Sequence, residues 1–134
     1  MTFEFQDSGE ALGNNYSYSV SVALGDLDGD GDLDAMVGNI NQPNTVWTND
    51  GSGTFTNSGQ ALGNSQSRSV ALGDLDGDGH PELVFNNYYS GSWTSYPDTF
   101  IYWGSAGGYS ESSRTELDTA GSWPTVQLVG RTAW

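Results

Sequence analysis

The 134-residue chain contains no cysteine and no lysine, and its basic residues are three arginines and one histidine. Without cysteine it can form neither disulfides nor thiolate metal sites. Seventeen acidic residues bring the formal net charge to −14. A chain this acidic offers no basic surface to neutralise phosphates, which argues against nucleic acid and anionic membranes as partners.

Long hydrophobic runs are also missing. The longest apolar run is far shorter than the roughly 20 residues of a membrane-spanning helix, so we expect no membrane insertion. The first ten residues, MTFEFQDSGE, have neither the basic start nor the apolar core of a signal peptide. A signal for export would therefore lie outside this sequence.

Strong helix formers are scarce, whereas Gly, Ser, Asn, Thr and aromatic residues are abundant, which favours an all-β fold. An internal repeat supports this prediction. The stretch SVSVALGD at residues 19–26 returns as SRSVALGD at 67–74, and SGEALGN at 8–14 returns as SGQALGN at 58–64. The chain thus consists largely of two similar units.

Each unit predicts four short strands. In the first unit Val20, Val22 and Leu24 alternate with smaller residues, as in a half-buried strand, and a second alternating segment begins at Leu33. A third strand is expected at 44–48. After the turn-forming stretch NDGSG, residues 54–57 supply the fourth.

Four strands in each 40–50-residue unit are typical of a β-propeller blade. A β-sandwich is the alternative, but it does not require consecutive units to be near copies. We predict a partial β-propeller with two complete four-stranded blades at about residues 16–57 and 65–113, and partial blades at 1–12 and 114–134. A closed propeller needs about four to eight blades. We therefore expect a fragment of a larger propeller whose remaining blades belong to the same parent chain.

An acidic loop follows the first strand of each unit. Calcium takes six to eight oxygen ligands, which a loop can supply from carboxylates at positions 1, 3 and 5, a carbonyl at position 7 and an acid at position 9, with a glycine at position 6. Both loops have this spacing and predict two Ca²⁺ sites. The predicted ligands are Asp26, Asp28, Asp30, the Asp32 carbonyl and Asp34 in the first loop, and Asp74, Asp76, Asp78, the His80 carbonyl and Glu82 in the second.

The side chain of Asp32 is expected to face water, and so is the His80 ring. Position 12, where an EF-hand has a glutamate, is the apolar Val37 or Phe85. Each acidic loop is therefore expected in a β-hairpin.

The motif DLDGDGxxD between alternating strands, followed by NDGSGTF at 49–55, resembles the FG-GAP/VCBS repeats of integrin-α-like seven-bladed β-propellers. The resemblance covers residues 1 to about 117. It implies calcium between the first two strands of each blade, an extracellular, cell-surface or periplasmic location, and a role in adhesion and ligand binding. The second loop departs from the motif with Pro81 and with glutamate at position 82.

Signs of catalysis are weak. His80 is the single histidine, and it occupies a loop position where the backbone carbonyl matters. The acids outside the two loops include Asp98, Glu111, Glu116 and Asp118, whose spacing does not single out the carboxylate pair of a glycosidase. We do not expect an enzyme.

The connection between the second and third strands is longer in the second unit and rich in aromatic residues. Exposed aromatics on a loop suit ligand binding, including binding of sugars, although two of these rings could instead fold back over the blade edge. The candidate ligand-binding residues are Tyr88, Tyr89, Trp93 and Tyr96. We expect a calcium-stiffened interaction or adhesion module with a protein or glycan ligand. A carbohydrate-binding propeller is the alternative, and part of a secreted enzyme is a third possibility.

Overall fold

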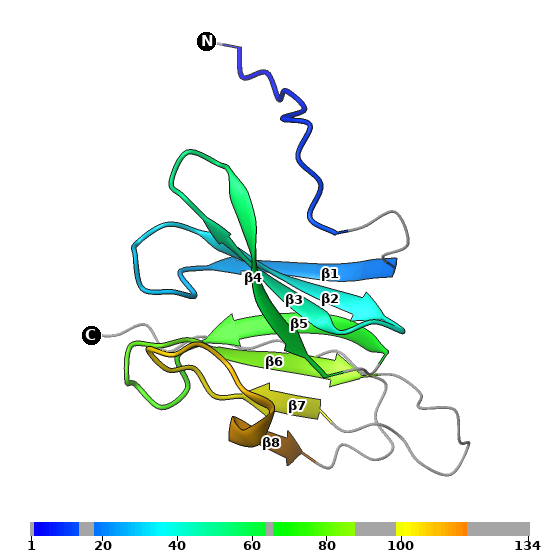
Figure 1. The fold of residues 1–134 in the computed structure, drawn as a ribbon, viewed down its shortest axis with the longest axis vertical. Coiled ribbons are helices and arrows are strands. Elements are labelled where there is room, and N and C mark those ends of the chain that lie inside the picture. Colours follow the sequence, from blue (N-terminus) through cyan, green and yellow to red (C-terminus); the bar gives the residue numbers. More distant parts are fainter. Residues whose placement is uncertain (1, 14–17, 64–65, 88–98, 118–134) are drawn as a thin grey trace.

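The computed structural model describes residues 2–13, 18–63, 66–87 and 99–117. These residues form two four-stranded antiparallel sheets, in each of which the strands lie in sequence order (Figure 1). The first sheet contains β1 (Tyr18–Gly25), β2 (Asp34–Ile40), β3 (Asn44–Asn49) and β4 (Phe55–Leu62). The second contains β5 (Ser67–Gly73), β6 (Glu82–Asn87), β7 (Thr99–Tyr102) and β8 (Arg114–Leu117), with the short 3₁₀ helix η1 (Glu111–Ser113) before β8.

The predicted all-β fold is confirmed, and the two sheets are two blades of a partial β-propeller. None of the described residues forms a helix with the length and hydropathy of a membrane span.

The repeat in the sequence is also a repeat in strand register. Val22 pairs with Val37 in the first blade, and Val70 pairs with Phe85 at the same place in the second. The pairing of the first two strands is irregular at equivalent positions in the two blades. These positions lie between Ser19 and Ser21 in the first blade and between Ser67 and Ser69 in the second. Residues 48 apart in these strands therefore occupy equivalent positions.

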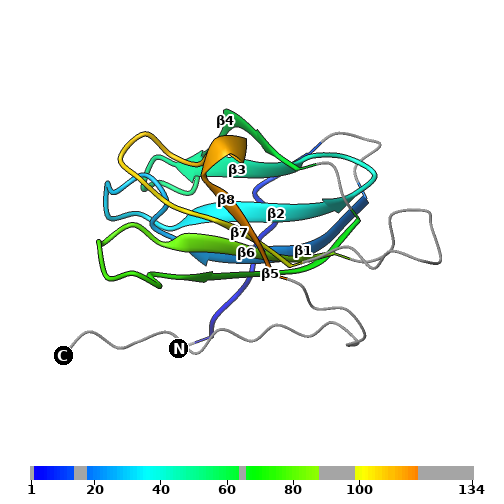
Figure 2. The ribbon, with the colours of Figure 1, turned by 90° about the horizontal axis from the view of Figure 1, so that it is seen from below.

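The two blades pack face to face and share one hydrophobic core, with β1 and β2 lying against β5 (Figures 1 and 2). In the second blade, the rings of Phe85 and Tyr102 meet edge to face, with centroids 5.6 Å apart. The core joins side chains of both blades: Leu27, Met36, Val46, Leu62, Val70, Leu83, Phe85, Tyr102 and Tyr109. Because no blade encloses this cluster alone, each blade stabilises the other.

The side chains of β1 face the other way from our expectation. Val20, Val22 and Leu24, expected to be half-buried, are 42%, 60% and 58% exposed. The intervening Ser21 and Ala23 are partly buried toward the second blade. A blade has two faces, and in the first blade the small residues of β1 point toward the neighbour.

The strand limits differ from the predicted ones at the blade ends. The fourth strand of the first blade continues to Leu62, because Leu62 pairs with Asn44 of β3. The second blade continues to Leu117, so residues 114–117, which we expected in a following partial blade, pair with β7 instead. Residues 2–12, the described part of the partial blade expected at 1–12, form no strand. The rest of the partial blade predicted at 114–134 lies outside the described residues.

The outer strand β8 is held by an arginine. The guanidinium carbon of Arg114 lies 4.1 Å from the ring centroid of Phe100 in β7. Its nitrogens lie 3.1 Å from a carboxylate oxygen of Glu111 and 2.6 Å from one of Glu116. The Phe100 ring thus links Arg114 to β7, whereas Glu111 and Glu116 lie in η1 and in β8 itself and orient the guanidinium.

Candidate metal centre

The first acidic loop connects β1 to β2 and is shaped by its own aspartates. The carboxylate of Asp26 accepts hydrogen bonds from the N–H of Gly29 at 2.7 Å and of Gly31 at 3.0 Å. Asp28 accepts from the N–H of Asp30 at 3.1 Å. Gly29 and Gly31 have φ of +87° and +94°, a conformation that favours glycine. The turn therefore curls its backbone around the carboxylates.

The second acidic loop, between β5 and β6, has the same hydrogen bonds. Asp74 accepts from the N–H of Gly77 at 2.7 Å and of Gly79 at 3.1 Å. Asp78 accepts from the N–H of His80 at 2.8 Å. The two loops therefore share these backbone hydrogen bonds despite Pro81 and Glu82 in the second.

The acid at loop position 9 is fully buried in both blades. In the first blade one oxygen of Asp34 accepts from the N–H of Leu27 at 2.7 Å and of Asp28 at 3.3 Å, and the other accepts from the N–H of Asn49 at 2.8 Å. This carboxylate ties the start of the loop to the end of β3.

Glu82 does the same in the second blade. Its oxygens accept from the N–H of Leu75 at 2.5 Å and of Gly104 at 3.3 Å. Glutamate in place of aspartate thus keeps the anchoring role. Sequence reasoning missed Asn49 and Gly104 because they contribute backbone N–H groups, which side-chain motifs do not reveal.

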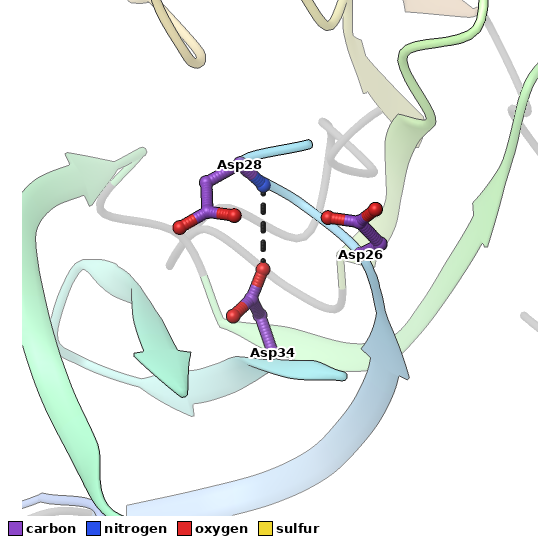
Figure 3. Close-up of side chains that lie close together, drawn as sticks. All are labelled: Asp26, Asp28 and Asp34. Carbon is purple, nitrogen blue, oxygen red and sulfur yellow. Dashed lines mark hydrogen bonds between the residues drawn. The ribbon is translucent and has the colours of Figure 1, made fainter. Parts of the chain in front are cut away.

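Three carboxylates converge in each loop. One carboxylate oxygen from each of Asp26, Asp28 and Asp34 lies within 4.8 Å of the other two (Figure 3). The same holds for one oxygen from each of Asp74, Asp76 and Asp78 in the second loop. Of the predicted carboxylate ligands, Asp30 and Glu82 lie outside these clusters. Asp30 instead accepts from the N–H of Asp32 at 2.9 Å.

The environment of the first cluster changes the pKa of Asp28. Partial removal of this carboxyl from water raises its pKa, and the nearby carboxylates of Asp34 and Asp30 raise it further. A cation among these groups would relieve the repulsion and favour the ionised form.

The side chain of Asp32, which we expected to face water, instead lies close to Gly51. It is half-buried, and one of its oxygens lies 2.5 Å from the point where a Cβ on Gly51 would stand. Gly51, with φ of +81°, belongs to the β3–β4 turn. In that turn Asp50 accepts from the hydroxyl of Ser52 at 2.6 Å and from its N–H, which lowers the pKa of Asp50. The acidic loop and the turn therefore pack together at one end of the blade.

His80, whose ring was also expected to face water, is a partly buried residue. The candidate ligand-binding aromatics Tyr88, Tyr89, Trp93 and Tyr96 lie outside the described residues.

Residues 26–85 match the FG-GAP-like repeat family, and residues 67–111 match the FG-GAP repeat family. Two overlapping stretches of the chain are thus similar to FG-GAP repeats. No curated protein matches the chain. The first FG-GAP match begins at Asp26 and ends at Phe85 of β6, so it contains both acidic loops. The second covers the same second loop and ends in η1, so the two FG-GAP matches overlap on one of the two carboxylate clusters.

Proposed function

We propose that this chain is a non-enzymatic, calcium-binding β-propeller module of the integrin-α-like and VCBS type, which acts outside the cell or at its surface in adhesion or in binding a protein or glycan. The observation that carries the proposal is the convergence of three carboxylates at the same place in two successive blades. FG-GAP repeats occur in cell-surface and adhesion propellers and often bind calcium, which supports the proposal.

The donor atoms suit calcium in particular. Carboxylate and carbonyl oxygens are the ligands that Ca²⁺ prefers, whereas zinc sites usually include histidine or cysteine. The first cluster would hold one ion through Asp26, Asp28 and Asp34, and the second would hold another through Asp74, Asp76 and Asp78. Bound Ca²⁺ would supply the positive charge that each cluster lacks, and so stiffen that end of the blade.

Calcium binding is tested by melting and by titration of the full chain. Binding to the folded state alone adds about 2.7 kcal/mol per site at a hundredfold excess over Kd. We expect Tm to rise with calcium and to fall with a chelator. We also expect calorimetry to find two sites with Kd on the order of 10⁻⁴ to 10⁻³ M.

Three single variants make the test specific. Asp28→Asn and Asp76→Asn should each remove one site. Glu4→Gln changes the charge equally at an exposed residue outside the clusters and should keep both sites. Coincident melting curves with calcium and with chelator would contradict the proposal, and so would two intact sites in Asp28→Asn.

A further inference from the structure

A cavity lies between the two blades, beside the first acidic loop. Its volume is about 200 Å³, and it is partly open to solvent. The first blade lines it with the start of the acidic loop, β3 and β4, and the second blade lines it with residues 105–108, between β7 and η1. Pockets for drug-sized ligands measure about 300–1,000 Å³. This interblade cavity therefore suits a smaller ligand, such as one long side chain.

The interblade cavity has apolar walls. Leu27 and Val46 line it and are themselves only 6% and 1% exposed. Ala106 of the second blade lines it as well. The side-chain oxygen of Gln60, in β4, accepts the N–H of Tyr109 at 2.7 Å, which holds the segment after β7 against the first blade. An aliphatic chain in the cavity would therefore contact apolar side chains of both blades.

The hydroxyl groups in the lining have already committed their hydrogens. Ser105 donates to the carbonyl of Gly108 at 2.9 Å, and Thr48 donates to the carbonyl of Thr56 at 3.4 Å. Their oxygens keep lone pairs that can accept further hydrogen bonds. Of the described residues that line the cavity, Asp28 alone is charged, and a carboxylate accepts without donating. These three side chains therefore favour a ligand that donates hydrogen bonds.

The charge beside the cavity favours a cation. Asp28 belongs to the cluster with Asp26 and Asp34 (Figure 3). One Ca²⁺ in this cluster would offset two of its three negative charges, so the cluster attracts a cation with or without calcium. The chain contains no lysine. An ammonium group in the cavity would therefore come from another molecule.

We propose that the interblade cavity binds the side chain of a lysine from a partner protein. The ammonium group has three donors and no acceptor, which matches a lining of Asp28, Thr48 and Ser105. The aliphatic stem of the lysine packs along Leu27 and Val46, as such stems do on apolar surfaces. The inference rests on the proposed role in binding a protein, but it does not require calcium.

Titration of the full chain in excess chelator tests the proposal. The probe is the Nα-acetyl amide of lysine, and the matched control is the Nα-acetyl amide of norleucine, which has the same four-carbon stem without the ammonium group. We expect the lysine probe to shift the NMR signals of the Gly107 and Gly108 N–H groups. It should bind at least about tenfold more tightly than the control. Equal affinities of the two probes would overturn the recognition of the ammonium group.

Three variants place the probe in the cavity. Asp28→Asn should weaken binding of the lysine probe at least about fivefold. Asp32→Asn removes the same charge from the same loop outside the lining and should change the affinity less than about twofold. Ala106→Leu fills the cavity from an exposed position and should also weaken binding at least about fivefold, while calcium titrations stay unchanged.

Two results would overturn the site. Equal losses in the two asparagine variants would mean that the acidic loop attracts the probe only as diffuse charge. Full binding by Ala106→Leu would place the probe outside the cavity. Because the probe titrations contain no calcium, they succeed or fail independently of calcium binding, which the melting and calorimetry experiments test separately.

Discussion

At the scale of single residues, Asp34 serves both the candidate metal cluster and the loop itself. Its carboxylate lies in the cluster with Asp26 and Asp28, yet its oxygens already accept N–H groups from Leu27 and Asn49. A carboxylate oxygen has two lone pairs, so one oxygen can accept an N–H and still face a cation. The same acid therefore anchors the loop and contributes an oxygen to its carboxylate cluster.

Replacing Asp34 should destabilise the fold even when no calcium is present. Asp34→Asn replaces one accepting oxygen with an NH₂ group, so the backbone N–H that this oxygen accepts loses its partner. Leaving a buried donor unpaired costs about 1–3 kcal/mol. The measurement is urea denaturation in excess chelator. Asp32→Asn removes the same charge from the same loop and is the matched control, with an expected change within about 0.5 kcal/mol. Equal effects of the two variants would mean that repulsion between carboxylates, and not the anchor, sets the stability of the loop.

The position of each acidic loop in a β-hairpin could be predicted from the sequence, because its aspartates and turn glycines lie within a few residues of one another. Asp26 reaches Gly29 and Gly31, three and five residues away. The anchors could not be predicted, because Asn49 and Gly104 lie 15 and 22 residues from the acids that they contact. Their positions depend on where the third strand of each blade ends.

At the scale of strands, β1 and β5 have nearly the same sequence but different surroundings. Period-two alternation shows that a strand has two kinds of face, but it does not show which face a neighbour covers. The strand order within each blade followed from the near-identical repeats and their turn residues. The extension of β4 to Leu62 could not be predicted from the repeats, because it depends on pairing with Asn44 of β3.

This difference between equivalent strands can be measured. Val70→Ala removes two carbon atoms from the shared core and should cost about 1.5 kcal/mol, at about 0.8 kcal/mol per buried methylene. Val22→Ala makes the same change on the exposed face and should stay within about 0.5 kcal/mol. Denaturant titration of both variants gives the comparison. A loss at Val22 as large as that at Val70 would show that both faces of the first blade are covered in solution.

At the scale of the whole molecule, the charge is concentrated at particular places. Nine of the 17 acidic residues lie in the two acidic loops, at Asp26, Asp28, Asp30, Asp32, Asp34, Asp74, Asp76, Asp78 and Glu82. Three arginines do not offset this charge. Self-repulsion of this kind lowers the stability of a compact state and weakens as salt screens it, with a Debye length of about 8 Å at 0.15 M.

The salt response should therefore depend on calcium. In chelator, Tm should rise as sodium chloride increases from about 0.05 M to about 0.5 M, because screening weakens the repulsion between carboxylates. In saturating calcium the same increase should have a smaller effect, since each cluster is then largely neutralised. Differential scanning calorimetry measures both series. Equal salt responses would place the dominant repulsion outside the two clusters.

The arginine that holds β8 also determines how the folded chain would be cut by trypsin. The chain offers trypsin only Arg68, Arg114 and Arg131, since it has no lysine. Arg68 lies within β5 and Arg114 begins β8, and a protease needs an extended segment that has left its sheet. Cleavage after Arg114 thus requires β8 to separate from β7 and its guanidinium to leave the Phe100 ring. The rate of that single cut reports how often the outer edge of the second blade opens.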